Sequence, residues 1–232
     1  MNEPGTVTTE SLIEGFRPVA EKHDMRFRLV DARHKTRVLV MVSKISHCLV
    51  NLLHRARVGS LPIEIVGVVS NHTDLQPLVD FYGVPFHHVP VTRHTKPQAE
   101  AQLLEIAASY DTELVVLARY MQILSDELTQ QLAGRCINIH HSFLPSFKGA
   151  RPYHQAHERG VKLIGATAHY VTADLDEGPI IAQSVQPVTH AQTAADFVAR
   201  GRDVEGSTLA QAVRWHAQHR VLADGRRTVV FS

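Results

Sequence analysis

The residues with the clearest capacity for chemistry are Asn138 and His140, which stand two positions apart at the end of a short apolar run. An apolar run that stops abruptly at polar residues and Pro145 is typical of a buried strand in a parallel sheet. Residues two apart on a strand project to one face, and ligands of open α/β sheets bind at the carboxyl ends of the strands. A carboxamide can donate to a developing oxyanion and an imidazole can move a proton near neutral pH, so the pair favours acyl chemistry.

A third candidate, Asp176, lies in a short acidic loop between two later apolar runs. Gly178 permits a tight bend there, and a carboxylate beside a strand-end histidine can orient the imidazole or a water molecule. Acids in such a loop often serve only to solvate a hairpin, and composition alone favours that interpretation. The presence of Asn138, His140 and His169 in neighbouring strand-like segments favours a catalytic role for Asp176.

Metal binding has to be weighed because the chain contains 16 histidines. Asn138 is a poor metal ligand, no Cys joins the histidines, and no His-Glu-x-x-His helix motif occurs. We therefore expect no metal site. The histidines that could otherwise form a cluster are His87, His88, His140, His141, His154, His157 and His169.

The elements that would position these residues follow a regular alternation from Arg37 onward. Apolar runs rich in β-branched residues alternate with segments of helical periodicity, which predicts a parallel, right-handed, doubly wound α/β sheet. The expected strands are residues 38–42, 63–69, 85–89, 114–118 and 136–140, and the expected helices are residues 48–59, 75–82, 96–110 and 125–132. Residues 70–74 are expected to provide turn and N-cap side chains.

The second half of the chain has a different pattern. Residues 164–171 and 180–185 are strand-like and are joined by the short acidic loop, which predicts an antiparallel edge on the otherwise parallel sheet. A long helix is expected over residues 197–218. Together with residues 37–163 they would form one Rossmann-like domain, residues 37–232.

Residues 1–36 differ from the rest. Residues 10–22 have the apolar spacing of a helix that Pro18 should weaken, residues 25–29 alternate like an edge strand, and residues 31–35 read as a linker. So small a segment cannot hold its own core, so we expect it to dock on the main domain or on another subunit.

Composition restricts the partners and the compartment. The 24 Lys+Arg and 23 Asp+Glu give a formal net charge of +1, which argues against a nucleic-acid or anionic-membrane surface. Cys48 and Cys136 lie in apolar runs, where buried free thiols are expected. No stretch has the apolar length of a membrane span and no targeting signal begins the chain, so the cytosol is the expected location.

The first strand-to-helix turn, residues 43–47, is where a phosphate-binding protein would place glycines, and it contains none. This argues against a dinucleotide-binding fingerprint. Lys44 could attract an anion, although a solvated lysine is the more common role.

Several longer motifs then occur in a fixed order: residues 42–44, 47–49, 118–125, 138–149, 148–156, 169–171 and 174–181. This series resembles the formyltransferase family that uses 10-formyltetrahydrofolate, and more closely the formyltetrahydrofolate deformylases. The resemblance runs from about Arg37 to Phe231. The related glycinamide ribonucleotide formyltransferases carry a glycine-rich phosphate loop where this chain has residues 43–47.

The resemblance implies a hydrolase that converts 10-formyltetrahydrofolate to formate and tetrahydrofolate, with water as nucleophile and no cofactor. The formate would supply purine biosynthesis and the reaction would balance one-carbon folate pools. The implied catalytic residues are Asn138, His140 and Asp176: Asn138 and protonated His140 would stabilise the oxyanion, and Asp176 would position water or tune His140. The implied folate-binding residues are Arg119, Tyr120, Met121, Gln122, Ile123, Leu124, Val171, Thr172, Ala173 and Asp174.

Other functions remain open: a folate-binding or sensing protein with weak turnover, or a formyltransferase to an unidentified amine acceptor. Residues 11–31 resemble only the last helix and strand of an ACT regulatory domain, so residues 1–36 are interpreted as a remnant of such a domain with its linker. The apolar helix face of this segment favours a homo-oligomer.

Overall fold

The computed structural model describes residues 8–145 and 151–231, so residues 146–150 of the sequence motifs lie outside the described part. The chain divides into two compact units, Met1–His34 and Lys35–Ser232. The helices are α1 (Thr9–Lys22), α2 (His47–Arg57), α3 (Gln76–Tyr82), α4 (Lys96–Ser109), α5 (Asp126–Gln131), α6 (Pro152–Glu158) and α7 (Ala194–Ala217). The strands are β1 (Thr36–Val42), β2 (Ile63–Ser70), β3 (Phe86–His88), β4 (Leu114–Leu117), β5 (Cys136–His140), β6 (Leu163–Tyr170), β7 (Ile180–Pro187), β8 (Val221–Asp224) and β9 (Arg227–Val230).

The first unit contains the predicted helix but not the predicted strand. Thr8 caps α1 in a capping box with Ser11, and the helix continues through Pro18. The expectation of a strand at residues 25–29 is wrong, because residues 25–30 carry no strand hydrogen bonds in the described part. An alternating pattern becomes a strand only beside a partner strand, and the described residues of this unit provide no other extended segment that pairs with it.

The second unit is built on a seven-stranded sheet with the order β3-β2-β1-β4-β5-β6-β7. The strands from β3 to β5 pair in parallel, and β6 and β7 pair antiparallel at one edge, as predicted. The α/β fold class inferred from the sequence is therefore confirmed. The alternation of apolar runs and amphipathic segments was sufficient to determine it.

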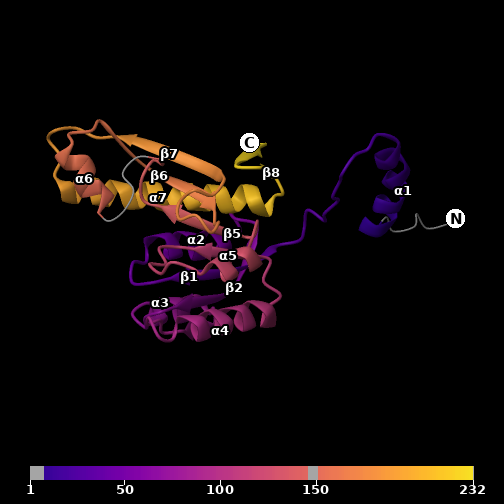
Figure 1. Cartoon of the computed structure of the whole chain (residues 1–232), viewed down its shortest axis with the longest axis horizontal. Helices are drawn as coiled ribbons and strands as arrows, with labels where there is room; N and C mark the ends of the chain where they lie inside the picture. Colours follow the sequence, from indigo (N-terminus) through magenta and orange to yellow (C-terminus); the bar gives the residue numbers. More distant parts are fainter. Residues whose placement is uncertain (1–7, 146–150, 232) are drawn as a thin grey trace. The chain divides into compact units, whose positions relative to one another are not determined.

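Helices cover both faces of the sheet, so the strands are apolar on both sides. Val38 and Val40 of β1 pack into the cluster formed with α2, α3 and α7, whereas Leu39 and Met41 pack into the cluster formed with α4 and α5. Figure 1 shows α7 running along β6 and β7 on its face of the sheet. Burial on both faces explains why these runs are continuous rather than alternating.

The strand order reverses at β1, whose neighbours are β2 on one side and β4 on the other. Such a switch point opens a crevice at the carboxyl ends of the two strands. Here Ser43, which follows β1, donates its backbone N–H to the Arg119 carbonyl (3.2 Å) and accepts the Met121 N–H on its Oγ (2.9 Å). These bonds fix the segment that follows β4 at the rim of the crevice.

Three local features differ from the sequence-based expectations. Helix α3 has Leu75 at its N-cap position with no side-chain cap, so the predicted capping by residues 70–74 is wrong. Helix α6 and the β8–β9 hairpin were not predicted, since each is too short for a clear periodic signal. No helix in the described ranges is long and apolar enough to cross a membrane.

Candidate active site

A cavity of about 730 Å³ lies at the carboxyl ends of β4 and β5. It is lined by every residue that the sequence predicted for catalysis or folate binding: Asn138, His140, Asp176, Arg119, Tyr120, Met121, Gln122, Ile123, Leu124, Val171, Thr172, Ala173 and Asp174. Its size is that of a small-molecule site. Its wall also includes His47, His141, Tyr153, His169 and Glu205.

His140 ends β5 and contacts Asp176 from the loop between β6 and β7. Nδ1 of His140 lies 3.1 Å from Oδ2 of Asp176, and both side chains are largely buried. The other ring nitrogen of His140, Nε2, is buried and has no hydrogen-bond partner in the described part of the chain. The carboxylate therefore orients the ring and stabilises positive charge on it, while Nε2 remains free for the reacting group.

Asp176 is held as an anion. Burial on its own raises the pKa of Asp176, but hydrogen bonds with His140 and His169 outweigh this and hold that pKa well below its ordinary value. The residue has a φ of +58°, a conformation that Asp tolerates better than most residues. Gly178 contributes space rather than a left-handed bend, since a Cβ there would collide with the carbonyl of Tyr170.

Asn138 stands opposite His169 in the β5–β6 register. Nδ1 of His169 donates to the Tyr170 carbonyl at 2.9 Å, which orients the ring so that Nε2 points toward the cavity side of β5 and lies 3.6 Å from Oδ1 of Asp176. The amide nitrogen of Asn138 lies 3.3 Å from the same Nε2. This contact orients the carboxamide, and a primary amide has two N–H donors with which to bind an oxyanion.

The segment after β4, which was predicted to bind folate, contributes exposed apolar side chains to the cavity wall and a buried one behind it. Met121 and Ile123 are 58% and 63% exposed, so they can cover a flat ring system. Leu124 is buried in the cluster under α4 and supports the wall from behind. Arg119, at the start of this segment, has a φ of +65° and a side chain that turns inward.

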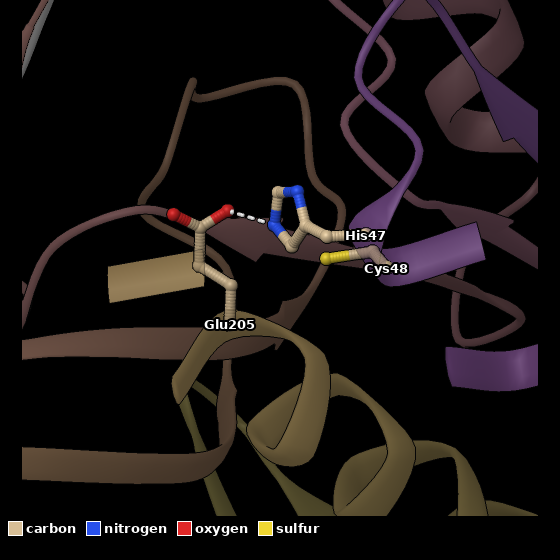
Figure 2. A group of neighbouring side chains, drawn as sticks. All are labelled: His47, Cys48 and Glu205. Atoms are coloured by element: carbon tan, nitrogen blue, oxygen red, sulfur yellow. Dashed lines mark hydrogen bonds and ion pairs between the residues drawn. The ribbon is translucent and has the colours of Figure 1, made fainter. Parts of the chain in front are cut away.

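The sequence did not predict a buried polar network around Glu205 of α7. The Tyr153 hydroxyl donates to Oε1 of Glu205 at 2.8 Å, His47 Nε2 lies 2.8 Å from Oε2, and Arg119 Nε lies 3.5 Å from Oε2. Figure 2 shows the His47 imidazole directed at the carboxylate from the start of α2. Burial alone would raise the pKa of Glu205. The hydrogen bonds and charges of His47, Arg119 and Tyr153 outweigh burial and hold that pKa below its ordinary value, so the residue is an anion.

His47, Cys48 and Glu205 are also a group of potential metal ligands among the described residues, with ligand atoms within 4.8 Å of one another (Figure 2). It differs from the histidines considered from the sequence, and it does include a cysteine. Tyr153 and His47 already occupy the two carboxylate oxygens, and the Arg119 cation lies beside them. Burial and the Glu205 charge raise the pKa of the Cys48 thiol well above its ordinary value. This donor set fits an ion-pair network better than a metal site.

Comparisons with known proteins agree with this geometry. The family model described as formyl transferase matches residues 36–213. A formyltetrahydrofolate deformylase from Corynebacterium sp. (strain P-1) is 59% identical over 221 residues, which are 95% of this chain and 77% of the relative. The crystal structure of a formyltetrahydrofolate deformylase from Burkholderia mallei ATCC 23344 matches with a TM-score of 0.92 and 53% identity, over 99% of this chain and 82% of that chain. The chain belongs to the formyltetrahydrofolate deformylase family.

The same fold is shared by a second group of relatives. A glycinamide ribonucleotide transformylase from Symbiobacterium toebii matches with a TM-score of 0.80 and 30% identity, over 89% of this chain and 99% of that chain. The deformylase-family assignment therefore rests on the closer identity and on the motifs, rather than on the fold alone.

The residues that sequence reasoning missed are His47, His141, Tyr153 and Glu205. For one of them, the sequence contains a usable indication: Glu205 is an acidic residue on the apolar face of α7, between Val204 and Leu209. A buried acid on a helix face requires partners. Those partners come from α2, α6 and the segment after β4, so only the tertiary structure identifies them.

Proposed function

We propose that this chain hydrolyses 10-formyltetrahydrofolate to formate and tetrahydrofolate. The main support for this proposal is that Asn138, His140 and Asp176 line one cavity of small-molecule size. The chain that contains this cavity belongs to the deformylase family. The reaction needs an oxyanion donor, a proton donor for the leaving nitrogen and water, and no cofactor.

The substrate would lie with its pterin against the wall formed by Met121 and Ile123 and with its formyl group beside β5. Asn138 donates to the formyl oxygen as negative charge develops there, and His140 Nε2 donates to the same oxygen or to the departing N10 nitrogen. Asp176 keeps the His140 ring oriented and stabilises its charge. These roles are supported by the free Nε2 of His140 and by the anchored carboxamide of Asn138.

Formate release without an acceptor tests the function. Purified protein and 10-formyltetrahydrofolate are incubated alone, and formate and tetrahydrofolate are quantified over many turnovers. Equimolar catalytic release supports hydrolysis. A bound but unchanged substrate would instead indicate a folate-binding protein, and turnover only after addition of an amine would indicate a transferase.

We further propose a cytosolic location and a homo-oligomeric state. The two cysteines are free and buried, which suits a reducing compartment. Leu12 and Val19 of α1 are exposed apolar side chains of the first unit, and they provide a face for association. Sedimentation of the purified chain measures the oligomeric state directly.

A further inference from the structure

None of the three proposed catalytic side chains is an effective base for the attacking water. Burial raises the pKa of Asp176, but its contacts with His140 at 3.1 Å and His169 at 3.6 Å hold that pKa well below its ordinary value, so the carboxylate is a weak base. The Asn138 carboxamide can hydrogen-bond to water through its carbonyl oxygen, but an amide is too weak a base to take the proton. Water is a weak nucleophile that needs a base as its bond to carbon forms.

His141 is a second imidazole beside His140. Its ring centroid is 5.1 Å from that of His140, and it lines the same cavity. No hydrogen bond joins its imidazole to another of the described residues. Burial, followed by the charge of Arg119, lowers the pKa of His141 to about 4, so the ring is neutral at pH 7. A neutral imidazole has one nitrogen lone pair that can accept a hydrogen bond from water.

The backbone beside His141 is anchored, and its ring has an aromatic neighbour. Thr167 of β6 donates its hydroxyl to the Ser142 carbonyl at 2.9 Å, which anchors the backbone directly after His141. The ring of Tyr153 lies 6.3 Å from the His141 ring, and the Tyr153 hydroxyl is held by Glu205. These neighbours keep the His141 ring on the wall of the cavity, next to the proposed catalytic residues.

We propose that His141 is a catalytic residue that binds the attacking water and takes its proton. The proposal rests on the hydrolytic function proposed above. The water oxygen bonds to the formyl carbon while one water proton passes to His141, and Asn138 and His140 stabilise the resulting oxyanion. The bond from carbon to N10 then breaks, and N10 takes a proton from protonated His140. Formic acid leaves and ionises to formate, and the proton on His141 returns to His140 through solvent, so both rings are restored.

The test compares two nucleophiles. Hydroxylamine attacks through a neutral nitrogen that need not lose a proton first, and it converts the formyl group to formohydroxamate while tetrahydrofolate leaves. We expect His141→Gln to lower kcat for formate release by about a hundredfold or more, with KM and hydroxylamine transfer within about threefold of wild type. His141→Ala should behave alike. His54→Gln, an exposed histidine on α2, is the matched control and should leave both reactions unchanged.

Each alternative result has a definite meaning. Formate release by His141→Gln at a rate close to wild type would overturn the proposal. An equal loss of hydrolysis and hydroxylamine transfer, together with a raised KM, would also overturn it, because it would show that His141 only supports the fold of the site. Absence of formate release by the wild-type protein would instead refute the hydrolytic function itself.

Discussion

The ring of Tyr153 rests directly on the backbone of Gly201, so closely that a Cβ at residue 201 would overlap the ring. Gly201 lies inside α7, where glycine is unfavourable for helix stability. Glycine is nevertheless present because only a residue without a side chain leaves room for the Tyr153 ring, which crosses α7 to place its hydroxyl 2.8 Å from Glu205. One missing side chain on α7 thus permits the buried network beside the cavity.

The first prediction concerns this contact. Gly201→Ala should lower the free energy of unfolding by about 1–3 kcal/mol, because overpacking displaces Tyr153. Helix propensity alone would give the opposite sign, by about 1 kcal/mol. Urea denaturation of the wild-type protein and of Gly201→Ala shows whether the substitution lowers or raises the free energy of unfolding. Gly206→Ala in the same helix, where a Cβ would meet only the Asn51 side chain at 3.3 Å, is the control and should lose less.

The second prediction concerns the pair His140 and Asp176. Asp176→Asn removes the anion that orients and charges His140, and His140→Ala removes the proton donor. Each should lower kcat for formate release by about 10²–10⁴-fold, the range for loss of acid–base catalysis. The double variant should lose little more than either single one, because the two groups act as a unit. Strictly multiplicative losses would argue that they act separately.

The third prediction concerns Asn138. Asn138→Ala should lower kcat by about 10²–10³-fold, the loss typical of removing one oxyanion donor. KM should change little, since the carboxamide acts on charge that develops only in the transition state. Steady-state kinetics of formate release measures both constants. A raised KM with an unchanged kcat would assign Asn138 to ground-state binding.

The sequence contained enough information for the fold and for the position of this site. Residues 38–42 and 114–118 are continuous apolar runs, which are typical of strands covered on both faces of a sheet, whereas the strand order that creates the switch point comes from the structure. Asn138 and His140 share a face because strand geometry has a period of two.

Two parts of the site depend on information that local patterns do not contain. His141 follows the last residue of β5, where the alternation that placed His140 no longer applies. The partners of Glu205 are brought together by packing between helices far apart in the sequence. The missing strand at residues 25–29 has the same origin, because a strand is defined by a neighbour and not by its own sequence.

The fourth prediction concerns stability and pH. The pKa of His141 is lowered from 6.5 to about 4 in the folded protein, by burial and by Arg119, although Glu205 and Asp176 oppose the shift. As the pH falls from 6.5 toward 4, the unfolded chain binds a proton at residue 141 that the folded chain does not, so this residue reduces stability over that interval. His141→Gln should therefore lose less stability than wild type between pH 7 and pH 5. Urea midpoints at the two pH values measure this, and parallel losses would contradict it.

The last prediction concerns the acceptor. We expect no transfer of the formyl group to glycinamide ribonucleotide. To bind this substrate, backbone N–H groups at the turn after β1 would have to surround its phosphate. Glycines at the turn would let the backbone come close enough to do so. Here side chains fill the turn: the Ser43 hydroxyl bonds to Asn71 at 2.8 Å and receives the Met121 N–H, and His47 is held by Glu205.

The measurement is a competition in one mixture. The protein is given 10-formyltetrahydrofolate with glycinamide ribonucleotide in excess, and formate and formylated ribonucleotide are quantified together. The transformylase from Symbiobacterium toebii, which shares the fold, serves as the positive control. Formate should accumulate at the rate seen without ribonucleotide, since an acceptor that cannot bind does not compete with water. Formylated ribonucleotide forming faster than formate would show that the filled turn still admits the phosphate.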